Sequence, residues 1–416
     1  MPSARHISEA ISWFPGLLRL PRSPGTGVSL VLLRSAQKDG VMFPIRPRHP
    51  QQRSAPTVLV LRHNAGLGGM GRAAEFFTPV LRRLCHAPTV VVLSAERTSD
   101  SFEASWPAKI GTTASAVRRC AQALVTESPD AVYLPIAQWG LPLLRDALVV
   151  ALAKATGSTP VLHLHGAQLP ARLSRALFLR KALGGAHWIV LSEDVSADLR
   201  ASGCRTRSVT VIRNPAPQAH PETRALPQQT GAPSTALGAS RPMRVGWLGT
   251  MCRAKGFDIL CEAVDRMKRS GAAVEFSVAG MRRDVPHSRM GCVDRDLGVI
   301  QPADVRAFWS VVDVFVLPAR WAEGLPFVLL EAVQAGCAVA GTPSPGCAEL
   351  FRHGCVDDVE PTAASVAGFL EACRTDLDGV RDRQQKAWHR LRPLYAHDRV
   401  EESFARFWDT APFGEG

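Results

Sequence analysis

Short apolar runs alternate with segments of helical spacing along most of this chain. Runs such as 57–61 (TVLVL) and 89–93 (TVVVL) are continuously apolar, as expected for strands buried on both faces. Between them, for example over 71–84, apolar residues recur every three or four positions, which indicates amphipathic helices. Strands that alternate with helices predict parallel sheets with helices on both faces.

The predicted elements form two groups. The first has strands at 57–61, 89–93, 131–134, 161–164, 188–191 and 209–212, with helices at 71–84, 113–125, 141–155 and 172–183. The second has strands at 243–248, 274–279, 314–317 and 338–341, with helices at 257–269, 303–311, 326–335, 363–373 and 398–409. We therefore expect an α/β chain of two doubly wound, Rossmann-like domains that face each other across a cleft. Ligands of such sheets bind beyond the carboxyl ends of the strands.

Two segments fall outside this alternation. Residues 215–242 hold six prolines among small and polar residues, which predicts a linker. Residues 1–55 hold eight basic and two acidic residues, and apolar positions within 7–20 have helical spacing. Such a segment fits either a flexible tail or a basic helix on an anionic membrane surface. The predicted order is an extension (1–55), a first domain (56–214), the linker (215–242), a second domain (243–390) and a C-terminal helix with its tail (391–416).

The 416 residues carry a formal net charge of +12, which favours anionic partners. Because only seven of the 49 basic residues are lysines, an arginine-biased composition explains the charge equally well. No basic stripe interleaved with aromatic residues occurs outside the first 55 residues, so we expect no nucleic-acid partner.

Nothing in the sequence indicates a membrane span or a secretory leader. No window reaches the roughly 18 apolar residues of a spanning helix, and Pro15 and Arg19 interrupt the apolar stretch near the N-terminus. The ten cysteines are scattered without a C-x-x-C pair, so neither a zinc site nor a disulfide framework is expected. We expect a cytoplasmic protein with buried thiols.

A glycine-rich loop follows the first strand. Gly66, Gly68 and Gly71 match G-x-G-x-x-G, but residues 62–65 separate the loop from the strand, whereas a dinucleotide-binding turn is tight. A looser loop whose amides approach a phosphate or a sugar is the preferred interpretation, and a plain turn is the alternative.

A second loop, 249–257, places Arg253 and Lys255 between a strand and a helix. Two cations beside a helix N-terminus make an anion site that suits a diphosphate, and two solvated surface cations are the alternative. Because lysine is rare in this chain, Lys255 next to Gly256 favours the anion site.

The segment 323–332 (EGLPFVLLEA) carries two carboxylates around a helix start, where Pro326 suits the first helical position. Glu331 lies among apolar residues, so a buried carboxylate there needs partners, and sugar hydroxyls are good ones. The alternative is a glutamate at the rim of the helix facing water.

His163 and His165 alternate on one strand and therefore share a face. A metal pair would need a third ligand, and none is evident. A structural role is the main alternative to a role in a ligand site.

These motifs together resemble glycosyltransferase family 4, whose members are retaining transferases with a GT-B fold and nucleotide-sugar donors. The resemblance is carried by the loop 66–72, His165-Gly166, Asn214-Pro215, Gly249 to Gly256, the E-x7-E pair Glu323 and Glu331, and Gly346 to Glu349.

The resemblance implies roles by position. Glu331 would bind the ribose hydroxyls, Glu323 the donor sugar, and Lys255 the diphosphate. His165 would lie near the transferred sugar. The other implied donor contacts are Gly249, Thr250, Arg253, Gly324, Leu325, Pro326, Phe327, Gly68 and Gly69. Glu323, His165 and Lys255 are the candidate catalytic residues, and neither a metal nor another cofactor is expected. The terminal helix would cross back to the first domain.

One departure from the family pattern matters. The family usually has an arginine where Thr250 stands, and Arg253 is the candidate substitute. We therefore keep a non-catalytic nucleotide-sugar-binding scaffold and a nucleotide-sugar epimerase as alternatives, with an NAD-dependent dehydrogenase as a further one. The expected acceptor is a saccharide or a lipid-linked precursor of a surface polysaccharide.

Overall fold

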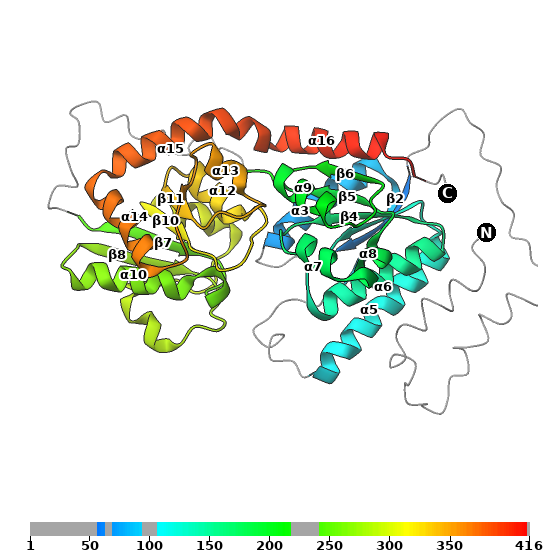
Figure 1. Ribbon diagram of the computed structural model, residues 1–416, viewed down its shortest axis with the longest axis horizontal. Coiled ribbons are helices and arrows are strands. Elements are labelled where there is room, and N and C mark those ends of the chain that lie inside the picture. The colour runs from blue at the N-terminus through cyan, green and yellow to red at the C-terminus, as the bar shows by residue number, and fades with distance from the viewer. Residues whose placement is uncertain (1–55, 63–68, 94–105, 218–240, 414–416) are drawn as a thin grey trace, which may run out of the picture. The chain divides into compact units, whose positions relative to one another are not determined.

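The computed structural model of the chain describes residues 56–62, 69–93, 106–217 and 241–413. Within them, strands and helices alternate and build two separate parallel sheets (Figure 1). The predicted extension 1–55 and most of the predicted linker lie outside the described residues. We call residues 57–211 the first lobe and residues 243–375 the second lobe.

The first lobe contains a sheet of six parallel strands, counted over the described residues, in the order β2-β1-β3-β4-β5-β6. The strands are β1 (Thr57–Arg62), β2 (His86–Val92), β3 (Ala131–Pro135), β4 (Thr159–Leu164), β5 (His187–Val190) and β6 (Ser208–Val211). The helices are α3 (Gly69–Leu84), α5 (Trp106–Glu127), α6 (Gly140–Ala155), α7 (Leu169–Arg175), α8 (Leu177–Leu183) and α9 (Glu193–Ala201).

Alternation along each strand gives this sheet two apolar faces. On β1, Leu59 and Leu61 belong to the core formed with α5 to α9, whereas Val58 and Val60 belong to the core formed with α3. Figure 1 shows α5, α6 and α8 on one side of the sheet and α16 (His397–Thr410) on the other. Burial on both faces explains why these strands are continuously apolar in sequence.

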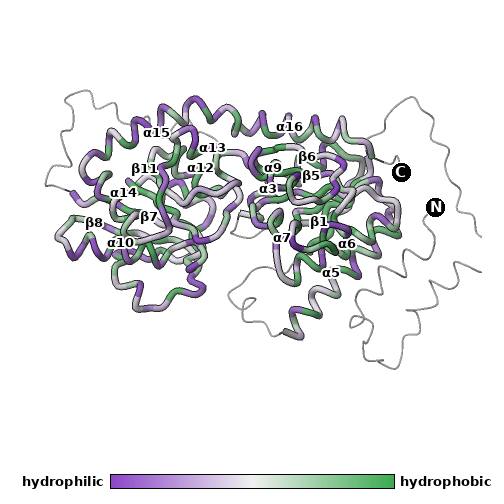
Figure 2. The backbone as a smooth tube through the Cα atoms, in the orientation of Figure 1, coloured by the Kyte–Doolittle hydropathy of each residue, from purple (hydrophilic) through white to green (hydrophobic). Residues whose placement is uncertain are grey.

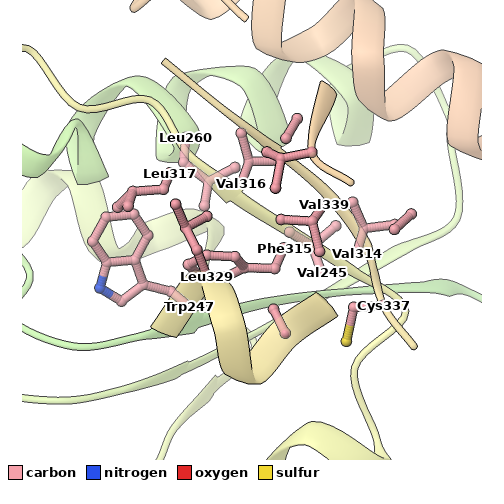
Figure 3. Close-up of a cluster of buried hydrophobic side chains, with 14 of the residues drawn as sticks. Val245, Trp247, Leu260, Val314, Phe315, Val316, Leu317, Leu329, Cys337 and Val339 are labelled. Atoms are coloured by element: carbon pink, nitrogen blue, oxygen red, sulfur yellow. The ribbon is translucent and has the colours of Figure 1, made fainter. Parts of the chain in front are cut away.

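The second lobe repeats the architecture, with strand order β12-β11-β10-β7-β8-β9 among the described residues. The strands are β7 (Met243–Leu248), β8 (Val274–Ala279), β9 (Arg295–Asp296), β10 (Val314–Leu317), β11 (Ala338–Gly341) and β12 (Asp357–Asp358). The helices are α10 (Phe257–Arg269), α11 (Val305–Ser310), α12 (Phe327–Gln334), α13 (Ala348–Arg352) and α14 (Ala363–Thr375). Figure 3 shows side chains of β7, β10 and β11 packed with Leu260 of α10 and Leu329 of α12.

The last two helices, α15 (Leu377–Leu391) and α16, return the chain to the first lobe. Phe404 and Trp408 of α16 are buried with Phe77 of α3 and Tyr133 of β3, and the rings of Phe404 and Phe77 lie 4.9 Å apart. Figure 2 shows hydrophilic and hydrophobic residues alternating along α15 and α16, the pattern of helices with one buried side. The predicted return of the terminal helix to the first domain is confirmed.

Several predicted elements differ in detail. The single helix predicted over 172–183 is two helices, because Ala176 between them is extended (φ −124°, ψ 93°). The helix predicted over 303–311 begins as a 3-10 turn (Pro302–Asp304) and continues as α11. Helices α9, α13 and α15 and the two-residue strands β9 and β12 were not predicted. Pro326 precedes α12 with an extended ψ of 126°, so the prediction that it takes the first helical position is wrong.

Candidate functional site

The loop after β7 brings Lys255 to the loop after β10. Lys255 ends a 3-10 turn (Arg253–Lys255) that Gly256 closes with a φ of 76°. A side chain at Gly256 would collide with the carbonyl oxygen of Pro318, the residue that follows β10. Because β7 and β10 are neighbouring parallel strands, their two loops meet at one edge of the sheet. The Lys255 Nζ atom lies 3.6 Å from Glu323 Oε1.

Glu323 is fixed by contacts beyond this ion pair. The indole Nε1 of Trp321 donates to Glu323 Oε1 at 2.7 Å, and the Ser344 hydroxyl donates to the Glu323 backbone carbonyl at 2.8 Å. Its side chain is 17% exposed, against 26% for Lys255. An ammonium and a carboxylate are thus held together, partly accessible, beside the start of α12.

Glu331 lies inside α12 with a side chain only 4% exposed. Its carboxylate forms an ion pair with Arg72 of α3 and accepts a hydrogen bond from the indole of Trp309 at 3.3 Å. Burial lowers the pKa of Arg72 from its usual value. The expectation that a buried Glu331 needs partners is met by an arginine of the first lobe. Sequence reasoning missed this pairing, although Arg72 ends the glycine-rich motif.

The first lobe meets the second at His165 and Gly324. A side chain at Gly324 would collide with the His165 backbone carbonyl, so the two backbones touch at this point. Nearby, the Asn214 amide donates to the Leu325 carbonyl at 2.9 Å, and Phe327 lies next to Gly69. The structure therefore brings three donor-contact candidates, Gly324, Leu325 and Phe327, against the first lobe and the segment that directly follows it.

The two strand histidines share one face, as predicted from alternation. Their ring centroids lie 3.9 Å apart, and His163 contacts the Tyr133 hydroxyl at 2.6 Å through Nδ1. Burial, together with the neighbouring ring of His165, places the pKa of His163 well below its usual value. His163 is therefore a neutral core residue, whereas His165, at the carboxyl end of β4, is partly exposed.

A second polar cluster connects the segment after the first lobe to Glu349 of α13 in the second lobe. Arg213 donates to both carboxylate oxygens of Glu349, at 2.7 and 2.9 Å, and the Tyr395 hydroxyl donates to Glu349 Oε2 at 2.7 Å. Burial alone would raise the pKa of Glu349, but the hydrogen bonds from Arg213 and Tyr395 outweigh it and hold the pKa below its usual value.

Residues 242–377 match the family described as glycosyl transferases group 1. An uncharacterised 42.6 kDa protein of the cps region of Klebsiella pneumoniae is 30% identical over 118 residues, which are 28% of this chain and 30% of that protein. The amylovoran biosynthesis glycosyltransferase AmsK of Erwinia amylovora is 25% identical over 125 residues, 27% of this chain and 31% of that protein. Such alignments span between 14% and 48% of the relatives' own lengths.

Similarity to solved structures extends over nearly the whole described chain. The Anabaena HepE protein, crystallised with UDP and glucose, superimposes with a TM-score of 0.59 at 17% identity, over 86% of this chain and 100% of that one. The chain has the GT-B fold. The predicted fold class is therefore confirmed.

Not every predicted donor contact reaches the Lys255–Glu323 pair of this GT-B chain. The Arg253 side chain is 70% exposed, and its Nε lies 4.0 Å from Asp258. Gly249 has a φ of 126°, and its carbonyl accepts from the indole of Trp247. Thr250 follows it and is partly exposed. Gly68 lies outside the described residues.

No group of three or more histidine, cysteine, aspartate or glutamate residues that could hold a metal ion occurs in the described part of the GT-B chain. All ten cysteines are free and buried, as predicted. None of the described helices is both long and apolar enough to cross a membrane.

Proposed function

We propose that the chain is a retaining glycosyltransferase that transfers a sugar from a nucleoside-diphosphate donor to a hydroxyl acceptor without a metal ion. The observation that carries the proposal is the Lys255–Glu323 ion pair, which lies beside the start of α12, next to the contact between Gly324 and His165. The match of residues 242–377 to glycosyl transferases group 1 supports it.

The leaving group in this proposal is a nucleoside diphosphate, which gains negative charge as the glycosidic bond breaks. Lys255 supplies a fixed positive charge, and the backbone amides at the start of α12 supply oriented dipoles. Displacement of Glu323 from Lys255 by the incoming diphosphate would free the carboxylate to accept hydrogen bonds from the donor sugar.

Glu331 is the proposed ligand of the ribose hydroxyls. Its carboxylate already has two partners, Arg72 and Trp309. A carboxylate has lone pairs for about four hydrogen bonds, so acceptor capacity for a ribose diol remains. His165 is proposed to position the transferred sugar, since it lies at the contact between the lobes. The acceptor hydroxyl would lose its proton to the departing phosphate.

The proposed acceptor is a saccharide or a lipid-linked precursor of a surface polysaccharide. Relatives are described as acting in amylovoran, colanic acid and Vi polysaccharide biosynthesis. We propose that the protein acts in the cytoplasm, with peripheral contact to an anionic membrane.

The test is a calorimetric panel of UDP, GDP and ADP against the wild type and Glu331→Ala. We expect one nucleotide to bind and its binding to be lost in the variant. Arg72→Met is the matched control, because it breaks the same ion pair while leaving the Glu331 carboxylate in place. Equal binding by wild type and Glu331→Ala would contradict the proposed ribose role. No binding by any nucleotide would favour the scaffold alternative.

Transfer and epimerisation are separated by a second measurement. With the donor sugar that matches the bound nucleotide, an epimerase releases nucleotide or converts the sugar without an acceptor, whereas a transferase needs an acceptor for fast release. We expect nucleotide release to be accelerated by a polysaccharide or lipid-linked acceptor fraction. Fast release in its absence, with an altered sugar, would support the epimerase.

A further inference from the structure

A hollow of about 750 Å³ lies on the first lobe, away from the Lys255–Glu323 pair. It is lined by α8, by the turn that leads into β5 and by the loop that leads into β6. Because the strands are parallel, this is the edge of the sheet where strands begin, opposite the edge where His165 follows β4. The hollow is therefore separate from the candidate donor site.

The lining carries uncompensated positive charge. Arg180, Lys181, Arg205 and Arg207 face the hollow, and no aspartate or glutamate lines it. Across the described residues, none of these four cations forms an ion pair with a carboxylate. The Nε atom of Arg180 is buried and lacks a hydrogen-bond partner among the described residues. Several like charges around one hollow, with a buried donor that lacks a partner, are stabilised by an anion.

The backbone around the hollow is held in place without using these cations. The Gly185 amide donates to the Arg205 carbonyl at 2.6 Å, and the Arg207 amide donates to the Ala186 carbonyl at 2.9 Å. A side chain at Gly203 would crowd the guanidinium of Arg180. The backbone of the turn after α8 is thus held beside the backbone of the loop before β6, and both segments contribute to the lining of the hollow.

The side chain of Lys154 hydrogen-bonds to backbone carbonyls at the C-terminal end of α8. Its ammonium donates to the carbonyls of Ala182 and Gly184, so the backbone acceptors there are occupied. Burial, with Arg207 nearby, lowers the pKa of Lys154 to about 8. Because the Lys154 ammonium already donates to these two carbonyls, the arginines of the lining, and not this lysine, are left for a ligand.

We propose that this hollow is an anion site for phosphate groups, presented either as the headgroups of an anionic lipid or as a soluble phosphate ester. Guanidinium groups match phosphate oxygens in pairs of hydrogen bonds, and three of the four cations are arginines. Leu177 of α8 lines the hollow and is 57% exposed, so it would contact an apolar portion of the ligand. Phe178, the next residue of α8, is 49% exposed and would extend this apolar surface.

The test compares two full-length double variants that remove the same charge. Arg205→Gln with Arg207→Gln removes exposed arginines of the hollow, and Arg82→Gln with Arg118→Gln removes exposed arginines elsewhere on the first lobe. Binding is measured by co-sedimentation with vesicles of phosphatidylcholine plus phosphatidylglycerol, and by calorimetry with pyrophosphate. Because pyrophosphate can also bind near Lys255, only the difference between the two double variants is interpreted.

For a lipid headgroup, we expect binding to the mixed vesicles but not to pure phosphatidylcholine. The apparent affinity falls about tenfold in the hollow variant and less than about twofold in the control. Leu177→Ser with Phe178→Ser would then weaken vesicle binding without changing pyrophosphate binding. If the ligand is a soluble phosphate ester, the two double variants should differ in their affinity for pyrophosphate but not in their affinity for vesicles. If the two double variants bound the vesicles with equal affinity and also bound pyrophosphate with equal affinity, the proposal would be overturned. Neither outcome depends on the nucleotide panel that tests the transferase.

Discussion

The guanidinium of Arg72 on α3 forms an ion pair with the carboxylate of Glu331 on α12. The pair joins the lobes at the residue proposed to hold the ribose, and Glu331 is 4% exposed. A carboxylate this buried is costly without a cation, so the two lobes are coupled through the charge of Glu331.

Replacement of Arg72 by Met should therefore destabilise the protein. We expect the free energy of unfolding to fall by about 2 kcal/mol, less than for a fully buried pair because Arg72 is 31% exposed. The double variant Arg72→Met with Glu331→Gln should recover most of that loss, since no buried charge then remains. Urea unfolding of the wild type, of Arg72→Met, of Glu331→Gln and of the double variant measures the coupling. If the single Arg72→Met variant were as stable as the wild type, water would already solvate the charge of the Glu331 carboxylate.

Asp313 should control the acid stability of the second lobe. Its side chain is 1% exposed and accepts hydrogen bonds from Arg241, Arg244 and Arg381. Burial alone would raise the pKa of Asp313, but the bonds from Arg244 and Arg241 hold it far below its usual value. A lowered carboxyl pKa gives stability that is complete above the unfolded value, about 3.9, and is lost as pH falls through the folded value.

We therefore expect the free energy of unfolding of Asp313→Asn to be about 3 kcal/mol lower than that of the wild type at neutral pH. This difference should shrink below about pH 4. Urea midpoints at neutral and acidic pH provide the measurement. Asp265→Asn is the matched control, because its exposed pair with Arg269 should contribute at most about 1 kcal/mol. If the difference in free energy of unfolding between Asp313→Asn and the wild type did not change with pH, the lost interaction would not depend on the charge of Asp313.

Strand and helix bounds could be predicted best where a local signal marks them. The bounds of β7 and α10 agree with prediction, because the first is a clear apolar run and a glycine with positive φ precedes the second. Helix α9 was missed because it is short, and the three consecutive polar residues before Val195 look like a loop. They are its start, with Ser192 accepting a hydrogen bond from the Val195 amide.

The candidate site could be predicted only in part. Lys255 and Glu323 follow the carboxyl ends of neighbouring strands, so a doubly wound order already places their loops together. The partner of Glu331 could not be predicted, since Arg72 belongs to the other lobe and no periodicity links the two. The cations of the hollow were likewise missed, because no local pattern relates α8 to the loop before β6.

Gly324→Ala should impair catalysis through the contact between the lobes. An added Cβ would collide with the His165 carbonyl, so His165 and the loop after β10 must separate. We expect transferase activity to fall by about 100-fold, as for other misplacements of a site by about an ångström. Gly368→Ala is the control, because its Cβ meets open space within α14 and helix propensity favours alanine. Full activity of Gly324→Ala would mean that this contact opens during turnover.

Lys255→Ala should reduce kcat with the proposed donor by about 100- to 1,000-fold, the range for loss of one charge-stabilising group. Glu323→Gln should raise KM or lower kcat while leaving binding of the free nucleotide nearly unchanged, because its proposed contact is with the sugar. Lys268→Ala is the matched control, since Lys268 pairs with Asp294 away from the loop after β10. Wild-type turnover in both site variants would remove these residues from the mechanism.

Thr250 should limit donor affinity if it stands where a second phosphate ligand belongs. Thr250→Arg adds a cation at a partly exposed position, so we expect about tenfold tighter binding of the nucleotide selected by the panel. Arg253→Gln should have little effect, because its side chain is 70% exposed and lies 4.0 Å from Asp258. Calorimetric titration of both variants with that nucleotide shows whether position 250 or position 253 is the site of the second phosphate ligand. If Arg253→Gln weakens binding tenfold while Thr250→Arg changes nothing, Arg253 is the second phosphate ligand and moves to the diphosphate on binding.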